Sequence, residues 1–142
     1  MKLRLEQRGF RVNSRFDSST DCAARSYGQV REFFRRQPCA GLSRASFEVR
    51  DRRGNLVLLA VAWVEMPHSA AAREFHELVD RHGTGNVTEL SREQGRHRNV
   101  RFTGEYYASR RDGTTVVNVQ AQPVGRAAVA MGLAEIVAES AR

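Results

Sequence analysis

The chain has 142 residues, of which 41% are apolar and 27% are charged, and it carries a formal net charge of +7. This length suits one domain that can bury a core, and the composition is typical of a soluble globular protein rather than a disordered or fibrous chain. The basic residues are almost all arginine and lie scattered along the sequence, which favours general solubility over a nucleic-acid groove. The first 20 residues lack the apolar segment of a secretory signal and, taken alone, predict a cytoplasmic protein.

Residues 1–20 are polar. Their arginines have helical spacing, but Gly9 and the polar residues between 13 and 19 oppose a stable helix. We interpret this segment as a polar lead-in or linker. Short alternations of apolar and polar residues around Leu3 and Phe10 leave an edge strand as the alternative. Residues 21–142 are predicted to form a single α+β domain.

A helix is predicted between Asp21 and Pro38, because apolar residues recur there at helical spacing and proline ends it. Cys22 and Cys39 lie just outside its ends. An ideal helix of about 14 residues is about 21 Å long, so a disulfide needs a shorter helix whose flanking segments fold back. Two cysteines without a CxxC motif disfavour a metal or thioredoxin-type site. The residues by themselves leave a disulfide and two separate buried thiols as equal alternatives.

Residues 56–65 are an apolar run, and both parities of the run are apolar. A strand exposed on one face alternates apolar and polar residues, whereas a strand covered on both faces is continuously apolar. We therefore expect a central strand with layers above and below it. Residues 45–50 and a turn containing Gly54 predict its hairpin partner.

The second half of the chain repeats this plan. Ser69 is expected to cap a helix that ends near residue 82, and a glycine loop follows at 82–86. A second hairpin is predicted over residues 100–123, and a last helix over 126–140. The predicted fold class is therefore α+β: a helix followed by two strand–strand–helix units, with a mostly antiparallel sheet covered by helices on both faces.

No pattern in the sequence indicates catalysis or metal binding. His76 and His82 are six residues apart, off the spacings that share a helix face, and His76 and Asp80 are expected on the solvent side of their helix. The serines lie in caps and turns without a nucleophile-elbow motif. The loop at 82–88 follows a helix and lacks the Walker A pattern, so a phosphate site is disfavoured. We predict no catalytic residue, no metal, no cofactor and no enzyme.

Aromatic residues interleaved with arginine can bind single-stranded nucleic acid on a sheet face. The best such set, which we take as a candidate partner surface, is Arg101, Tyr107, Arg110 and Arg111. Some of the neighbouring aromatic residues are expected in the core, so nucleic acid is a disfavoured partner. A cytoplasmic nucleic-acid-binding module that uses this basic and aromatic sheet face is the alternative function.

Several short motifs occur in the order of a known domain. They are Cys22, Ser26-Tyr27-Gly28, Pro38-Cys39, Leu42-Ser43-Arg44, Trp63-Val64-Glu65-Met66-Pro67, the DRHGTGNV stretch at 80–87, and Phe102-Thr103-Gly104 with Tyr107. Over residues 21–142 the chain resembles the extracytoplasmic C-terminal domain of actinobacterial membrane-anchored envelope proteins, to which no activity is assigned. The resemblance implies an oxidising compartment and a Cys22–Cys39 disulfide. It also implies a membrane anchor, which residues 1–142 lack.

The expected function is therefore that of a non-enzymatic extracytoplasmic binding or sensing domain of a membrane-tethered protein. Another protein or an envelope component is the expected partner. Reduced cysteines would favour the cytoplasmic alternative instead.

Overall fold

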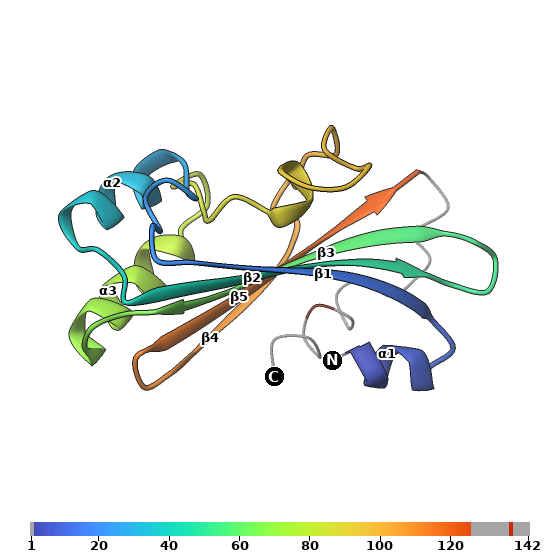
Figure 1. Cartoon of the computed structure of the whole chain (residues 1–142), viewed down its shortest axis with the longest axis horizontal. Coiled ribbons are helices and arrows are strands. Elements are labelled where there is room, and N and C mark those ends of the chain that lie inside the picture. Colours follow the sequence, from blue (N-terminus) through green and yellow to red (C-terminus); the bar gives the residue numbers. More distant parts are fainter. Residues whose placement is uncertain (1, 126–136, 138–142) are drawn as a thin grey trace.

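The computed structural model describes residues 2–125 and residue 137, which form a five-stranded antiparallel sheet with three α-helices (Figure 1). The strand order is β1-β2-β3-β5-β4, and the fold class is α+β as predicted. In chain order, the elements are α1 (Lys2–Gln7), β1 (Arg11–Ser19), α2 (Gly28–Arg36), β2 (Gly41–Arg50), β3 (Leu56–Glu65), α3 (Ser69–Val79), the 3-10 helix η1 (Leu90–Arg92), β4 (Tyr106–Asp112) and β5 (Thr115–Val124).

Strand β3 lies at the centre of the sheet between β2 and β5, which confirms the prediction from its apolar run. Its side chains are buried on both faces: Leu58 and Leu59, which point in opposite directions, are each 0% exposed. Burial of apolar surface contributes about 25 cal/mol per Å². Both faces of this one strand therefore contribute to the stability of the core.

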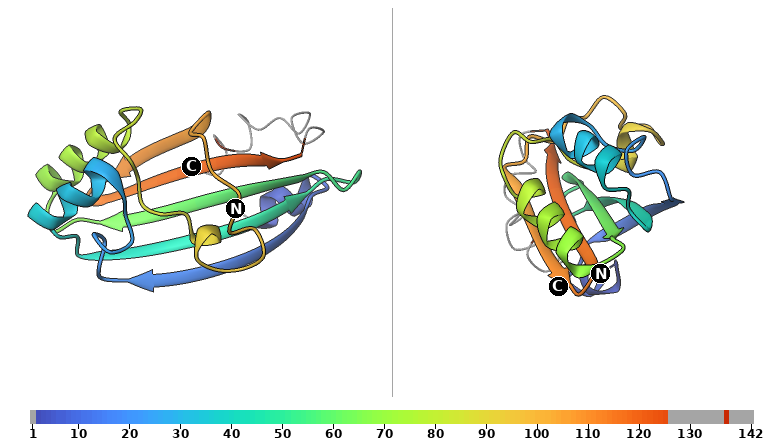
Figure 2. Two further views of the ribbon diagram at one scale, coloured as in Figure 1. Left: turned by 90° about the horizontal axis from the view of Figure 1, so that it is seen from above. Right: turned by 90° about the vertical axis from the view of Figure 1, so that its left-hand side faces the viewer.

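One face of the sheet, which we call the helical face, carries α2 and α3. Phe34 of α2 and Phe75 of α3 are buried with their ring centroids 4.9 Å apart. They belong to a core that also contains Val64 and Val116 of the sheet. Figure 2 shows the two helices together at one end of the sheet, so the rest of the helical face is left to other segments.

The opposite face of the sheet carries a second core, in which Val57, Leu59 and Val119 are buried. Leu5 of α1 and Val137 belong to the same core. The helix predicted over 126–140 lies outside the described residues apart from Val137. The predicted helical cover of both faces and the second strand–strand–helix unit therefore stay predictions.

Strand β1 corrects the preferred interpretation of residues 1–20 as a linker, and the edge-strand alternative is the one that forms. It pairs with β2 along its whole length, from Arg11 opposite Arg50 to Ser19 opposite Leu42. Its sequence is polar because an edge strand buries few side chains. Of the nine residues of β1, Val12 is the one that is buried. Periodicity within the strand alone could not reveal a partner supplied by β2.

Helix α2 has nine residues, fewer than the predicted helix, and begins at Gly28. Asp21 does not cap it; the Asp21 carboxylate instead accepts a hydrogen bond from the Ala24 amide at 3.0 Å in a preceding turn. The shorter helix lets its flanks fold back, which was the condition for a bridge. Cys22 and Cys39 form a disulfide, with their Cα atoms 6.1 Å apart.

Helix α3 begins at Ser69, the residue predicted to be its cap, and His68 provides the cap instead. Nδ1 of His68 accepts a hydrogen bond from the Ala71 amide at 3.1 Å. The first amides of a helix need a side-chain acceptor, and an imidazole nitrogen meets this need as a serine oxygen would. The helix ends at Val79, and the glycine loop follows it.

Candidate ligand-binding cleft

A cleft of about 630 Å³ lies on the helical face of the sheet, beside the area that α2 and α3 cover. One wall consists of side chains from the first three strands, and the other is the segment 91–97, which follows the start of η1. Figure 2 shows this segment lying over the sheet. Such a volume is in the range of pockets that hold small molecules.

Strand pairing brings polar side chains together at the floor of the cleft. Arg15 of β1 lies opposite Ser46 of β2, and Asn13 lies opposite Glu48. Side chains of paired residues point to the same face of a sheet, and here all four line the cleft. Leu58 of β3 completes the floor.

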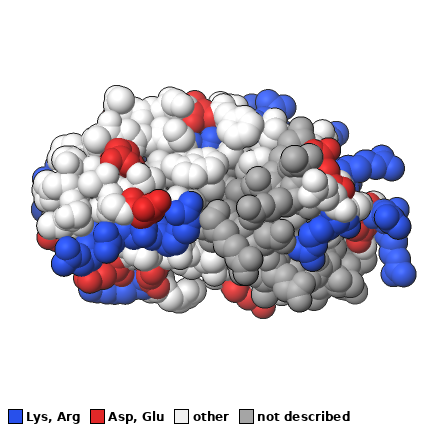
Figure 3. Space-filling view, turned by 90° about the horizontal axis from the view of Figure 1, so that it is seen from below, with Lys and Arg blue, Asp and Glu red and all other residues white. Residues whose placement is uncertain are grey.

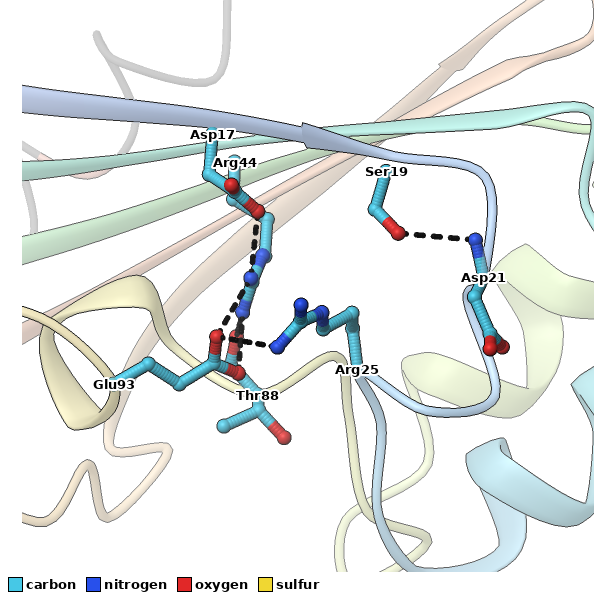
Figure 4. A network of polar contacts seen from close by, with 7 residues as sticks. All are labelled: Asp17, Ser19, Asp21, Arg25, Arg44, Thr88 and Glu93. Carbon is cyan, nitrogen blue, oxygen red and sulfur yellow. Dashed lines mark hydrogen bonds and ion pairs between the residues drawn. The ribbon is translucent and has the colours of Figure 1, made fainter.

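A buried arginine attaches the chain around residues 88–93 to the sheet (Figure 4). The side chain of Arg44 is 2% exposed, and its two terminal nitrogens contact both carboxylate oxygens of Glu93 at 2.9 Å each. They also donate to the Thr88 carbonyl oxygen at 3.0 Å and to Asp17 at 2.8 Å. Arg25 adds an ion pair to Glu93 at 3.0 Å.

We call the contacts of Arg44 with Glu93, Asp17 and Thr88 the clamp, and they pair its buried charge with carboxylates. A buried guanidinium needs partners for its charge, and the two terminal nitrogens of Arg44 bind two carboxylates that are each 26% exposed, while its buried Nε has no partner among the described residues. The hydrogen bonds from Arg44 hold the pKa of the Glu93 carboxyl below its ordinary value. Glu93 therefore stays ionised at neutral pH and positions the segment that forms the outer wall of the cleft.

An ion pair and a contact between a carboxylate and an imidazole also occur at the edge of the cleft. Glu48 lies 3.4 Å from Nη2 of Arg96 and 3.1 Å from Nε2 of His97. On the other side, a Cβ atom at Gly95 would lie 3.2 Å from Nε of Arg15, so glycine allows this side chain to approach the loop backbone. Gly95 also has a φ of +88°, which favours glycine.

Two hydroxyl groups lie in the lining of the cleft on largely buried residues. Ser46 is 7% exposed and Ser91 is 5% exposed. The Oγ atom of Ser91 is buried and has no hydrogen-bond partner among the described residues. Buried hydroxyls are normally paired, so this hydroxyl has hydrogen-bonding capacity that the described residues do not use.

A second cleft, of about 410 Å³, lies between the end of α3, the glycine loop and β4. Beside it, Asp80 accepts hydrogen bonds from the hydroxyls of Tyr107 at 2.7 Å and Ser109 at 2.6 Å. Nε2 of His76 lies 2.8 Å from Ser109 Oγ and 3.2 Å from Asp80. Burial and the bond to Asp80 raise the pKa of Tyr107. His76 and Asp80 therefore connect α3 to β4 and do not simply face solvent, as the sequence had suggested.

This serine, histidine and aspartate do not form a catalytic triad. In a triad the carboxylate binds one imidazole nitrogen and the serine hydroxyl binds the other, so that the histidine can take the serine proton. Here Ser109 and Asp80 both contact Nε2 of His76, and the Ser109 hydroxyl donates to Asp80. The cluster is a polar contact between two elements.

The four residues of the candidate partner surface do not share one face. Tyr107 and Arg111 lie opposite Gln120 and Val116 on the helical face, whereas Arg110 lies opposite Val117 on the other face. Arg101 is exposed in the loop before β4. Arg111 donates to the Gly113 carbonyl at 3.0 Å. Figure 3 shows one side of the molecule, on which acidic groups lie close to basic ones.

The glycine loop has a structural role. A Cβ atom at Gly85 would lie 2.2 Å from the Tyr27 carbonyl oxygen, because the backbones at Gly28 and Gly85 cross in direct contact. The Tyr27 amide donates to the Asn86 carbonyl at 3.0 Å, and the Val30 amide donates to the Thr84 carbonyl at 3.1 Å. The Thr84 carbonyl of the loop thus accepts a hydrogen bond from the Val30 amide, one of the first amides of α2, which have no acceptor within the helix.

Sequence reasoning missed the residues of the larger cleft. Arg15 was assigned to the polar lead-in or linker, and Glu48 lay in a predicted hairpin strand to which no functional role was given. The only local signal was that both strands alternate polar residues on one parity. The cleft forms because β1 pairs with β2 in one register and residues 91–97 return over both strands. The residues that meet are more than 30 positions apart in the sequence, so no local pattern reveals them.

Among the residues that the structure describes, 2–125 and 137, no helix is long and apolar enough to cross a membrane. In the same part of the chain, no cluster of three or more histidine, cysteine, aspartate or glutamate residues has the arrangement of a metal site. Comparisons with models of protein families, with curated proteins and with solved structures find no match to this chain.

Proposed function

We propose that this chain is a non-enzymatic extracytoplasmic domain of a membrane-tethered protein, and that it binds or senses a small ligand in the larger cleft. The cleft carries the proposal. It has the volume of a small-molecule pocket, a polar lining drawn from three strands, and an outer wall clamped to the sheet through Arg44 and Glu93. Rigid elements that present convergent polar groups are typical of binding sites.

The extracytoplasmic location is supported by the Cys22–Cys39 disulfide, since disulfides persist in oxidising compartments. It is also what the resemblance to actinobacterial envelope proteins implies. Alkylation of the denatured protein before and after reduction, followed by mass measurement, tests the bridge in protein isolated from its native host. Two free thiols in that material would overturn the extracytoplasmic location.

Ligand binding is tested with the ¹⁵N-labelled full chain and a panel of amino acids, sugars, sugar phosphates and nucleotides. Members of the panel that bind should shift amide signals of residues 13–15, 46–48 and 91–97. An Asn13→Trp variant should lose this response, because Asn13 is exposed on β1 and the larger side chain fills the cleft. Ser18→Trp is the matched control, since Ser18 is exposed on the other face of β1.

Two results would contradict binding in this cleft. One is that no member of the panel shifts these signals at any concentration tested. The other is that Asn13→Trp binds as well as Ser18→Trp does, which would place the ligand elsewhere.

The alternative, a nucleic-acid-binding module, has only the net charge of +7 in its favour, because the candidate surface is divided between two faces of β4. Nucleic-acid affinity falls steeply with salt when arginines neutralise phosphates. Fluorescence anisotropy with labelled single-stranded oligonucleotides at low salt tests it. Absence of binding there removes the alternative.

A further inference from the structure

The acidic groups nearest to Arg15 are already engaged with other residues. Asp17, two residues along the same face of β1, accepts a hydrogen bond from Arg44 at 2.8 Å. Glu48 lies within 3.4 Å of both Arg96 and His97. Within the described part of the chain, Arg15 has no hydrogen bond or ion pair of its own. The cleft therefore contains a guanidinium whose charge is not balanced locally.

The Arg15 side chain lies between the sheet and the loop that forms the outer wall of the cleft. It rises from β1 opposite Ser46, and its Nε atom lies against the backbone of Gly95. The residue is exposed, so a ligand in the cleft can reach its guanidinium. Its planar, forked set of donors matches the oxygens of a carboxylate or a phosphate.

Ser91 provides an independent observation, a hydroxyl whose hydrogen-bonding capacity is unused. The residue is 5% exposed, lines the cleft, and leaves its Oγ atom without a partner in the part of the chain that is described. A buried, unpaired hydroxyl is unfavourable in the free protein. The Oγ atom is shielded from solvent in the free protein, so a rotation about χ1 of Ser91 would bring the hydroxyl to a ligand oxygen that accepts its hydrogen bond.

We propose that the cleft binds a small ligand through an acidic group, a carboxylate or a phosphate, that contacts Arg15 and Ser91. This inference rests on the proposed function, because it specifies the ligand class of the same cleft. Glu48, opposite Asn13 in the same polar lining, accepts a hydrogen bond from a hydroxyl or amine of the ligand. The ligand class is thus a small, polar acid that also carries hydrogen-bond donors.

Three related probes test the acidic group: glycerol, glycerate and glycerol 3-phosphate. Their binding to the ¹⁵N-labelled full chain is measured by titration at low salt. Glycerate, glycerol 3-phosphate or both should shift the amide signals of residues 13–15 and 91–97, and glycerol should not. The comparison of the two acids decides between a carboxylate and a phosphate. Added salt should weaken the binding, because the interaction is between charges near the surface.

Arg15→Gln should weaken binding of the acidic probe by about 10- to 100-fold, as expected for loss of a hydrogen bond to a charged group. Arg11→Gln is the matched control, because Arg11 lies on the same face of β1 but does not line the cleft. Ser91→Ala should also weaken binding, yet it should leave the melting temperature of the free protein unchanged or higher, since no hydrogen bond is lost.

The outcomes separate this inference from the proposed function. If neutral members of the larger panel bind in the cleft and the acids do not, the acidic ligand class is wrong while the binding function stands. Equal affinities of Arg15→Gln and Arg11→Gln for an acidic probe would also overturn the role of Arg15. If no compound of either panel shifts signals from the cleft, the inference and the proposed function both fail.

Discussion

Replacement of Arg44 by methionine tests the clamp that holds the outer wall of the cleft. The change removes two hydrogen bonds to Glu93, one to Asp17 and one to the Thr88 carbonyl, and it keeps most of the buried volume. Breaking a buried ion pair from one side costs about 3–5 kcal/mol, because the partner charge stays uncompensated. The two carboxylates are each 26% exposed and can recover some hydration. We therefore expect the low end, a loss of about 3 kcal/mol.

The assay is urea denaturation at pH 7, followed by circular dichroism with the disulfide intact. Arg25→Met is the matched control, because Arg25 makes one ion pair to the same carboxylate and its side chain is 44% exposed. An exposed pair contributes less than about 1 kcal/mol. A double-mutant cycle with Glu93→Gln measures how much of the loss comes from the Arg44–Glu93 pair.

The pH dependence gives a second readout of the same clamp. The pKa of Glu93 is lowered in the folded protein, mainly by the hydrogen bonds from Arg44, so the folded state binds fewer protons than the unfolded state below the ordinary pKa of about 4.5. The stabilisation is present above that pH and is lost as the pH falls through the folded pKa. The Arg44→Met variant should lose part of this dependence. If Arg44→Met costs no more than Arg25→Met and keeps the same acid dependence, the clamp does not stabilise the fold as argued.

Three further predictions concern the rest of the fold. Reduction of the Cys22–Cys39 disulfide, which spans 17 residues, should lower the free energy of unfolding by about 3 kcal/mol, measured by urea denaturation with and without reductant; equal midpoints would show that the bridge is dispensable. Gly85→Ala should destabilise by about 3 kcal/mol or more, because its Cβ would meet the Tyr27 carbonyl. Gly83→Ala, at a similar φ but with open space around it, should cost only about 1–2 kcal/mol, and equal losses in thermal melts would refute the crossing as the cause. Burial raises the pKa of Glu89, so ionisation of its carboxyl destabilises the folded state as the pH rises above about 4.5. The gain in stability that Glu89→Gln gives over the unsubstituted chain should therefore be larger at pH 7 than at pH 4.5, as measured by urea denaturation at both pH values. A loss of stability at pH 7 would contradict this.

The elements that were predicted correctly are those whose signal is contained within one segment. The run at 56–65 is apolar on both parities, and it forms the central strand β3. The stripes of α2 and α3 bury Phe34 and Phe75 as their helical spacing indicates. The helix bounds were less accurate, because caps depend on neighbours such as His68, whose ring nitrogen took the place expected for Ser69.

The elements that were missed depend on partners distant in the sequence. Strand β1 has a weak pattern of its own, and β2 supplies its hydrogen bonds. The disulfide was undecided from spacing alone, because a helix of the predicted length would have separated the two cysteines; the nine-residue α2 brings their Cα atoms to 6.1 Å. The arginine and tyrosine residues grouped near β4 were adjacent in sequence but alternate between faces, as residues of a strand do.

The sequence by itself determined the α+β class, the central strand and the positions of two helices, because hydrophobic periodicity is a local property that burial converts directly into structure. Only the tertiary structure decided which polar residues meet. It placed Arg44 between Asp17 and Glu93, left Arg15 without a hydrogen bond or ion pair among the described residues, and closed a cleft with residues 91–97. Polar contacts are set by strand register and by loops that return over the sheet, and neither leaves a periodic signal in the chain.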